Sequence, residues 1–159
     1  MMNDWQLFIR HAHRTTLHRS LDNGLSPKGL QQCSRLIKFL KLRIPLCEIK
    51  KIYSSPARRC VETALALSRV SGLEVEVLEI LEEKRPTETP QEFSKRLNFF
   101  MKLYKNAKRV CFVSHGDFLE LLAQKQGYRI RHWPKGSAIV FQKHKLKGVP
   151  RVLLDQINL

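Results

Sequence analysis

Cationic and imidazole side chains follow three separate apolar runs in this chain of 159 residues. They are Arg10 and His11, then Arg58 and Arg59, and finally His115. An arginine binds an anion through a fork of N–H donors, and a histidine ring near neutral pH carries either a lone pair or a proton on each nitrogen. If the three runs are neighbouring parallel strands, these side chains meet at one edge of a sheet and form a site for an anionic ligand.

The arginine pair indicates an anionic ligand in a second way. Arg58 and Arg59 follow Ser55-Pro56, and a serine before a proline is a typical start of a helix. Free backbone N–H groups and the positive end of the helix dipole attract anions there, whereas cations in the first turn disfavour the helix itself. Two arginines at this place therefore indicate ligand binding.

The elements that must position these residues alternate between strands and helices along the chain. Apolar runs predict strands at residues 5–9, 51–54, 74–78, 110–113, 137–141 and 152–157. Helical spacing and end signals predict helices from Ser26-Pro27 to about Arg43, from Ser55-Pro56 to Gly72, from Thr89-Pro90 to Tyr104, and over 117–126. This alternation predicts an α/β fold, a three-layer α/β/α sandwich with a mostly parallel central sheet.

The charge of the chain limits its partners. Lys and Arg number 29 and Asp and Glu number 14, and seven of the acids lie between positions 74 and 92. The formal net charge of +15 favours anionic partners, or it reflects only a solvated, lysine-rich surface. Few aromatic residues interleave with the basic ones, so a nucleic-acid partner is possible but not favoured.

Cysteine usage and the absence of long apolar segments favour a cytoplasmic protein. Four cysteines stand at irregular spacing without a CxxC pair, so we expect neither disulfides nor a metal site built on them. No apolar run approaches the roughly 18 residues of a membrane span, and no apolar stretch of signal length opens the chain. We expect no membrane association and a single domain over residues 1–159.

Four segments, taken together and in order, resemble motifs of the histidine phosphatase superfamily, whose fold is also called phosphoglycerate mutase-like. Phe8–Ala12 resembles that family's opening Arg-His-Gly/Ala motif, and Leu25–Gln32 resembles its Leu-Thr-x-x-Gly-x-x-Gln helix start. Tyr53–Ala64 resembles its Ser-Ser-Pro-x-x-Arg-Ala-x-x-Thr-Ala segment, and Val113–Gly116 resembles its second histidine motif. The match spans nearly the whole chain, whose small size is closest to the SixA-type phosphohistidine phosphatases.

The resemblance implies that His11 is a nucleophile that forms a phosphohistidine intermediate. It also implies that Arg10, Arg59 and His115 bind the phosphoryl group. Arg59, rather than Arg58, stands at the arginine position of the motif, which leaves Arg58 at the pocket rim or in solvent. The chemistry agrees, because phosphoryl transfer depends on positioning and on neutralising the equatorial oxygens, and a neutral imidazole can attack phosphorus.

The resemblance is incomplete at the general acid. Members of the family carry a Glu in a Leu-x-Glu segment, followed by a Gly-rich stretch that contains Trp. Leu81–Glu83 supplies the first part, but Lys84–Thr87 stands where the second would be. Glu83 is the candidate acid, with Glu82, Asp117 and the absence of any acid as the alternatives. A phosphohistidine substrate needs little help from an acid, because imidazole leaves more readily than an alkoxide.

These features predict a metal-independent phosphatase that acts on phosphomonoesters or on protein phosphohistidine. Its partner would be a phosphorylated small molecule or a phosphohistidine protein, and it would need no cofactor. A phosphoglycerate mutase-type phosphotransferase is the alternative enzyme, although Arg14–Leu17 lacks the Ser and Asn that mutases place there. A non-catalytic module that binds anions or nucleic acid is the alternative from another class. No carboxylate or cysteine shares the spacing of the histidines, so we expect no metal site.

Overall fold

The computed structural model describes residues 4–16, 21–143 and 150–154. Its strands are β1 (Trp5–Arg10), β2 (Lys51–Ser54), β3 (Val75–Val77), β4 (Val110–Ser114), β5 (Ala138–Lys143) and β6 (Pro150–Leu154). Its helices are α1 (Pro27–Arg43), α2 (Arg58–Ser71), α3 (Pro90–Tyr104) and α4 (Gly116–Lys125), with short 3-10 turns η1 (Leu46–Glu48) and η2 (Glu79–Leu81). The predicted strands are confirmed to within a few residues, except that positions 155–157 of the last one lie outside the described residues.

The six strands form one sheet in the order β3-β2-β4-β1-β5-β6. The neighbours from β3 to β1 are parallel, whereas β5 runs antiparallel to β1 and β6 antiparallel to β5. In the register of β1 and β4, Arg10 lies opposite Ser114. The strands that end in Arg10, Ser54 and Ser114 are therefore adjacent and end at the same edge of the sheet. This is the arrangement that would bring the predicted arginine and histidine side chains together.

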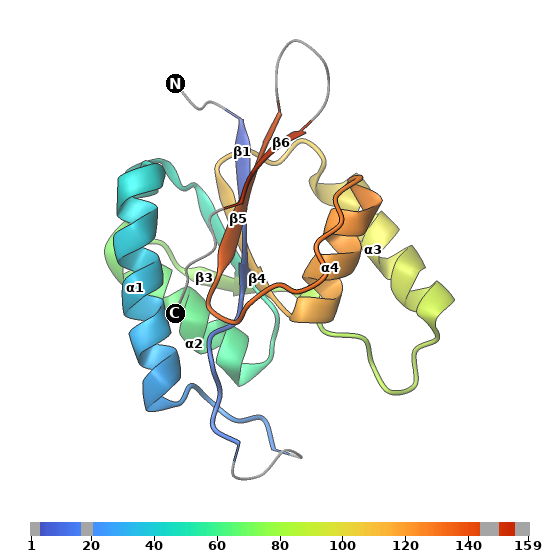
Figure 1. Ribbon diagram of the computed structural model, residues 1–159, viewed down its shortest axis with the longest axis horizontal. Helices are drawn as coiled ribbons and strands as arrows, with labels where there is room; N and C mark the ends of the chain where they lie inside the picture. Colours follow the sequence, from blue (N-terminus) through green and yellow to red (C-terminus); the bar gives the residue numbers. More distant parts are fainter. Residues whose placement is uncertain (1–3, 17–20, 144–149, 155–159) are drawn as a thin grey trace.

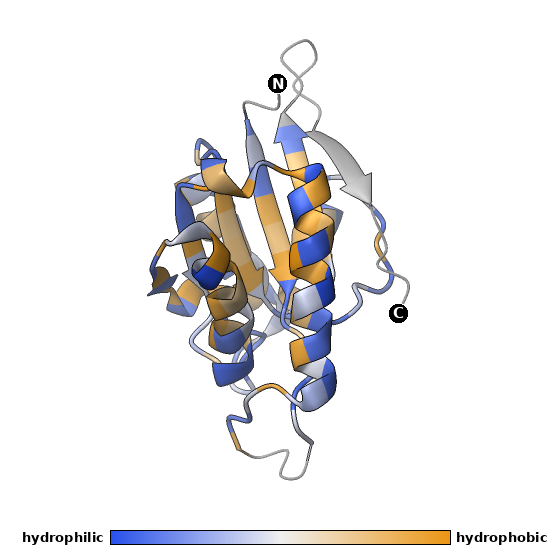
Figure 2. Ribbon diagram, turned by 90° about the vertical axis from the view of Figure 1, so that its left-hand side faces the viewer, coloured by the Kyte–Doolittle hydropathy of each residue, from blue (hydrophilic) through white to orange (hydrophobic). Residues whose placement is uncertain are grey.

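Helices cover both faces of the sheet, with α1 and α2 on one side and α3 and α4 on the other (Figure 1). Alternate residues of β1 point to opposite faces of the sheet. Leu7 and Ile9 pack with α1 and α2, and Phe8 packs with the aromatic rings on the side of α3 and α4. Figure 2 shows the apolar strands behind helices that carry both polar and apolar residues. The three-layer α/β/α fold is confirmed. Among the described helices, none has the length and apolar character that a bilayer span requires.

Capping interactions fix where the helices begin. Ser26 caps α1 by accepting a hydrogen bond from the N–H of Gly29, and Thr89 forms a reciprocal capping box with Glu92 at α3. The predicted start of α2 at Ser55-Pro56 is wrong, because that helix begins at Arg58 and Ala57 caps it without a side-chain bond. The hydroxyl of Ser55 is bonded to a histidine ring at 2.8 Å and accepts only a long bond, at 3.5 Å, from the N–H of Ala57.

Candidate active site

The functional side chains predicted from the sequence gather at the carboxyl ends of three strands. The N–H of His11 donates to the carbonyl of Ser114 (3.0 Å), and the N–H of Ser55 donates to the carbonyl of Val113 (3.0 Å). These two bonds continue the ladder one residue beyond β1 and β2. They hold His11, Ser55 and His115 level with one another, and the two imidazole rings lie 5.4 Å apart, centroid to centroid.

The backbone fixes the tautomer of His11. Its Nδ1 lies 2.8 Å from the carbonyl oxygen of Ala12, which can only accept, so the proton is on Nδ1 and Nε2 keeps its lone pair. That Nε2 lies 3.3 Å from Nε of Arg59. Burial, together with the charges of Arg59, Arg10 and Lys135, lowers the pKa of His11 to about 3. His11 is therefore a neutral imidazole whose lone pair points at a guanidinium.

The loop after His11 is held by the helix that carries the arginine. The N–H of Ala12 donates to the hydroxyl of Thr63 (3.0 Å), and that hydroxyl donates to the carbonyl of Arg59 (2.7 Å). Thr63 lies one turn after Arg59 on α2, so a single buried side chain joins the histidine loop to the arginine. The distance between the His11 loop and Arg59 is thereby fixed by the side chain of Thr63 and its two hydrogen bonds.

His115 is also a neutral ring, and its proton lies on the opposite nitrogen. Its Nδ1 is 3.2 Å from Nη2 of Arg59, which can only donate, and its Nε2 is 2.8 Å from the hydroxyl of Ser55. Nδ1 is therefore the acceptor and Nε2 carries the proton. Burial, with the charges of Arg59 and Arg10, lowers the pKa of His115 to about 2. The thiol of the buried Cys60 also approaches Nε2, at 3.5 Å.

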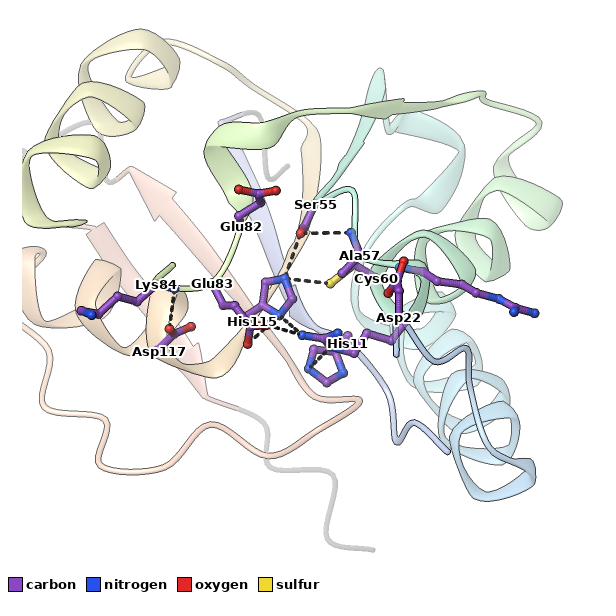
Figure 3. Close-up of polar contacts among 12 residues, drawn as sticks. His11, Asp22, Ser55, Ala57, Cys60, Glu82, Glu83, Lys84, His115 and Asp117 are labelled. Carbon is purple, nitrogen blue, oxygen red and sulfur yellow. Dashed lines mark hydrogen bonds and ion pairs between the residues drawn. The ribbon is translucent and has the colours of Figure 1, made fainter. Parts of the chain in front are cut away.

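Arg59 lies at the centre of this arrangement. It is the second residue of α2 and its side chain is 7% exposed. Its guanidinium contacts both histidines, and its Nη2 also donates to Oε1 of Glu83 at 2.7 Å. Two imidazoles and one carboxylate thus converge on a single buried guanidinium; Figure 3 shows both rings with Glu83 beside them.

Arg58 lies outside this cluster. Its Nε donates to Glu62 at 2.7 Å, and its side chain is 65% exposed. Its backbone N–H donates to both carboxylate oxygens of Asp22, at 2.8 and 3.1 Å, which supplies the acidic cap that the start of α2 otherwise lacks. Arg58 was expected at the pocket rim or in solvent, and its exposed side chain agrees with this.

Arg10 lies one step away from the cluster. Its guanidinium packs against Gly116, where an added Cβ would come within 2.8 Å of Cζ, and it donates to the carbonyl of Trp133. Burial lowers the pKa of Arg10, and the carboxylates of Glu120 and Asp117 oppose this. Because Gly116 follows His115 directly, Arg10 adds a second positive charge beside the two rings.

The three acid candidates separate clearly in space. Glu83 reaches the cluster: Oε1 accepts from Arg59, and Oε2 lies 3.8 Å from Nδ1 of His115. Glu82 points away from the rings (Figure 3) and pairs with Arg85 at 2.6 Å. Asp117 accepts from the N–H of Lys84 at 2.8 Å and from its neighbour Phe118. Of the three, only Glu83 is placed beside the histidines.

The segment that carries Glu83 is clamped from α3. Arg96 donates to the carbonyls of Ile80, Glu82 and Glu83 at 2.8–3.0 Å. Glu88 accepts two bonds from Arg96, and these bonds lower the pKa of Glu88 to about 2. Since Asp117 holds the next N–H, both sides of Glu83 are fixed, although its own side chain is 57% exposed.

Sequence reasoning missed three residues that shape the site. Ser55 was expected to cap a helix but bonds to His115. Thr63 lies in a matched segment and Arg96 lies outside all four, and neither was given a structural role. For Ser55 a signal was available, because a hydroxyl at the end of one strand stands beside the end of the next in a parallel sheet. For Arg96 the sequence holds no signal, since its carbonyl partners lie on an irregular segment.

This arrangement suits the binding and attack of a phosphoryl group. A guanidinium fork and a second arginine neutralise the oxygens, and a neutral imidazole with an inward lone pair is a nucleophile. In the described part of the chain, no group of three or more His, Cys, Asp or Glu side chains is placed to hold a metal ion. The cysteines of that part are all free thiols.

Comparisons with known proteins agree with this fold. Residues 6–86 match the family model of the histidine phosphatase superfamily (branch 1). The fold is similar to that of a mycobacterial glucosyl-3-phosphoglycerate phosphatase (TM-score 0.69, 18% identity, 96% of this chain and 97% of that one). It is also similar to an Entamoeba histolytica phosphoserine phosphatase (TM-score 0.68, 17% identity, 93% and 94%). A protein assigned as the phosphohistidine phosphatase SixA of Agrobacterium tumefaciens gives a TM-score of 0.68 at 17% identity, over 87% and 91%. No curated protein sequence matches the chain.

Proposed function

Because this chain belongs to the histidine phosphatase superfamily, we propose that it is a metal-independent phosphatase that works through a phosphohistidine intermediate. Its substrates are phosphomonoesters or protein phosphohistidine. His11 is the nucleophile, Arg10, Arg59 and His115 bind the phosphoryl group, and Glu83 is the general acid. The solved structures that share the fold are less than 25% identical to the chain, so they support the scaffold and leave the substrate to be determined.

One observation carries the proposal: Nε2 of His11, unprotonated, lies 3.3 Å from the guanidinium of Arg59. A phosphoryl group held by that guanidinium places phosphorus in front of the lone pair. The donor that faces this nitrogen is a buried guanidinium, and a guanidinium binds phosphoryl oxygens strongly through charge-assisted hydrogen bonds.

In the first step Nε2 of His11 forms a P–N bond as the bond from phosphorus to the leaving group breaks. An alkoxide leaving group takes a proton from Glu83 as it departs. In the second step a water gives a proton to the Glu83 carboxylate and attacks phosphorus. The P–N bond breaks and inorganic phosphate is released. Arg59, Arg10 and neutral His115 stabilise the equatorial oxygens in both steps.

The contact between Glu83 and Arg59 gives the substrate control over the acid. A phosphoryl group that takes over the Nη2 donor of Arg59 releases the carboxyl group of Glu83. The released side chain can then turn toward the leaving group.

The direct test is hydrolysis of 4-nitrophenyl phosphate by the purified chain in the presence of EDTA. We expect turnover that the chelator leaves unchanged, because every proposed catalytic group is a side chain. Absence of hydrolysis, combined with DNA or RNA binding that weakens steeply with salt, would instead indicate the non-catalytic module.

The need for Glu83 is expected to depend on the leaving group. Glu83→Gln keeps the size of the side chain and removes the transferable proton. It should slow hydrolysis of an alkyl phosphate by roughly 10²-fold, with far smaller losses on 4-nitrophenyl phosphate and phosphohistidine, whose leaving groups need little protonation. The measurement is kcat/KM on the three substrates.

Glu82→Gln is the matched control, since its side chain pairs with Arg85 away from the rings. A folding defect lowers all three rates together, so the comparison among substrates is insensitive to it. Equal losses on the three substrates would remove Glu83 from the acid role. No loss on any of them would leave Asp117, a water, or no acid.

A further inference from the structure

Three more cations surround the candidate site, and the reaction described above uses none of them. They are Arg14, Lys28 and Lys135, from three different segments. Arg14 and Lys135 are half-buried and Lys28 is exposed. What places them together is the backbone packing around residues 10–14.

Lys135 is fixed beside the nucleophile by the glycine that follows it. The N–H of Gly136 lies 3.2 Å from the carbonyl oxygens of both Arg10 and His11. Gly136 has a φ of 71°, and a Cβ there would come within 2.9 Å of Gln32. The position therefore requires glycine, and the close contact seats the preceding lysine against the peptide that carries His11.

Lys28 and Arg14 approach from the other side of the same segment. The N–H of Ser26 donates to the carbonyl of His13 (3.0 Å), and Arg14 forms an isolated antiparallel bridge with Leu25. Gly29 packs so closely on the carbonyl of His13 that a Cβ would lie 2.1 Å from its oxygen. The first turn of α1, with Lys28 on it, is thus held against the loop that leaves the nucleophile.

The three cations share one electrostatic environment and lack counter-ions. Within the described residues, none of them makes an ion pair or a side-chain hydrogen bond. Burial lowers the pKa of Lys135, and the charges of Arg10, Arg14, Arg59 and Lys28 lower it further. Together with the two arginines of the site they form a group of like charges, which repel one another unless an anion binds between them.

We infer that the substrate carries a second anionic group, a phosphate or a carboxylate, and that Arg14, Lys28 and Lys135 bind it. The scissile phosphoryl group lies on Arg59, and the second anion lies on the part of the substrate that leaves. This inference rests on the proposed function, and it narrows the substrate class to small phosphomonoesters with two anionic ends.

Binding of phosphonates tests the subsite without requiring turnover. The three ligands are propylphosphonate, propane-1,3-bisphosphonate and 4-phosphonobutanoate, and calorimetry at fixed ionic strength gives the dissociation constant of each. We expect the two ligands with a second anion to bind at least about tenfold more tightly than propylphosphonate, since each carries one more charge-assisted contact. The order of those two tells whether the second group is phosphate or carboxylate.

Two variants and one control assign the effect to these side chains. Lys135→Met and Arg14→Met remove a charge and keep most of the apolar stem, and each should reduce the preference for the doubly anionic ligands several-fold. Lys41→Met is the matched control, because Lys41 stands on the same helix as Lys28 but about 20 Å along its axis. The control should leave the preference unchanged.

Equal binding of the three ligands would overturn the inference, and so would a preference that survives unaltered in both test variants. The proposed function fails separately, through absence of 4-nitrophenyl phosphate hydrolysis. Ligand preference without hydrolysis would support the second-anion subsite and contradict the phosphatase activity. Hydrolysis of the ester without ligand preference would support the phosphatase activity and contradict the subsite.

Discussion

His11→Ala is expected to lower the hydrolysis of 4-nitrophenyl phosphate by roughly 10⁴-fold or more, because it removes the group that forms the covalent bond to phosphorus. The remaining groups still bind phosphate, so the loss should lie in kcat rather than in KM. Any activity that remains in His11→Ala would come from direct attack by water on a phosphoryl group held by Arg59. The measurement is steady-state kinetics over a range of substrate concentrations.

A trapping experiment separates a nucleophile from a base. Rapid quenching without acid, with ³²P-labelled substrate, should leave label on the peptide that contains His11. His132→Ala is the matched control, since His132 is exposed and has no contact with the site in the described structure. This variant should hydrolyse the substrate and be labelled like the wild type. Label on His115, or turnover without label at adequate time resolution, would contradict the assignment.

Arg59→Ala is expected to lower kcat/KM by roughly 10²–10³-fold, the usual cost of one charge-assisted donor aimed at the charge of the transition state. Arg58→Ala should lose no more than a few-fold, because its side chain pairs with Glu62 at an exposed position and such pairs contribute little. The two adjacent arginines form an internal comparison, with the same charge removed from the same helix turn.

The buried position of Arg59 requires a check on folding. Arg59→Lys keeps a cation and loses the fork, and we expect an intermediate loss, since a lysine cannot hold two phosphoryl oxygens in the same plane. Thermal unfolding followed by circular dichroism should show folded protein for each variant. If Arg58→Ala lost more activity than Arg59→Ala while both remained folded, the motif register would be wrong.

The elements of the fold could be predicted from local sequence because their signals are local. Ser26-Pro27 and Thr89-Pro90 mark helix starts through backbone capping, and the apolar residues of β1 and β4 mark strands buried on both faces. The same alternation of strands and helices predicts a mostly parallel sheet. From this it followed that Arg10, His11, Arg59 and His115 would meet, and the strand order confirms the meeting.

The tertiary structure decided what each side chain does once it is there. The Leu-x-Glu resemblance favoured Glu83 and left Glu82 open. Their separation in space depends on how Arg96 and Asp117 hold the irregular segment between η2 and α3. Ser55 carries the local signal of a helix cap, but its hydroxyl bonds to His115, which lies sixty residues away and directly follows β4. The hydrogen bonds of polar side chains at a site depend on partners distant in sequence. Helix and strand formation depends mainly on residues that are close in sequence. For that reason the scaffold could be predicted from the sequence. The tautomers of the two histidines, the separation of Glu83 from Glu82 and the positions of Arg14, Lys28 and Lys135 could not.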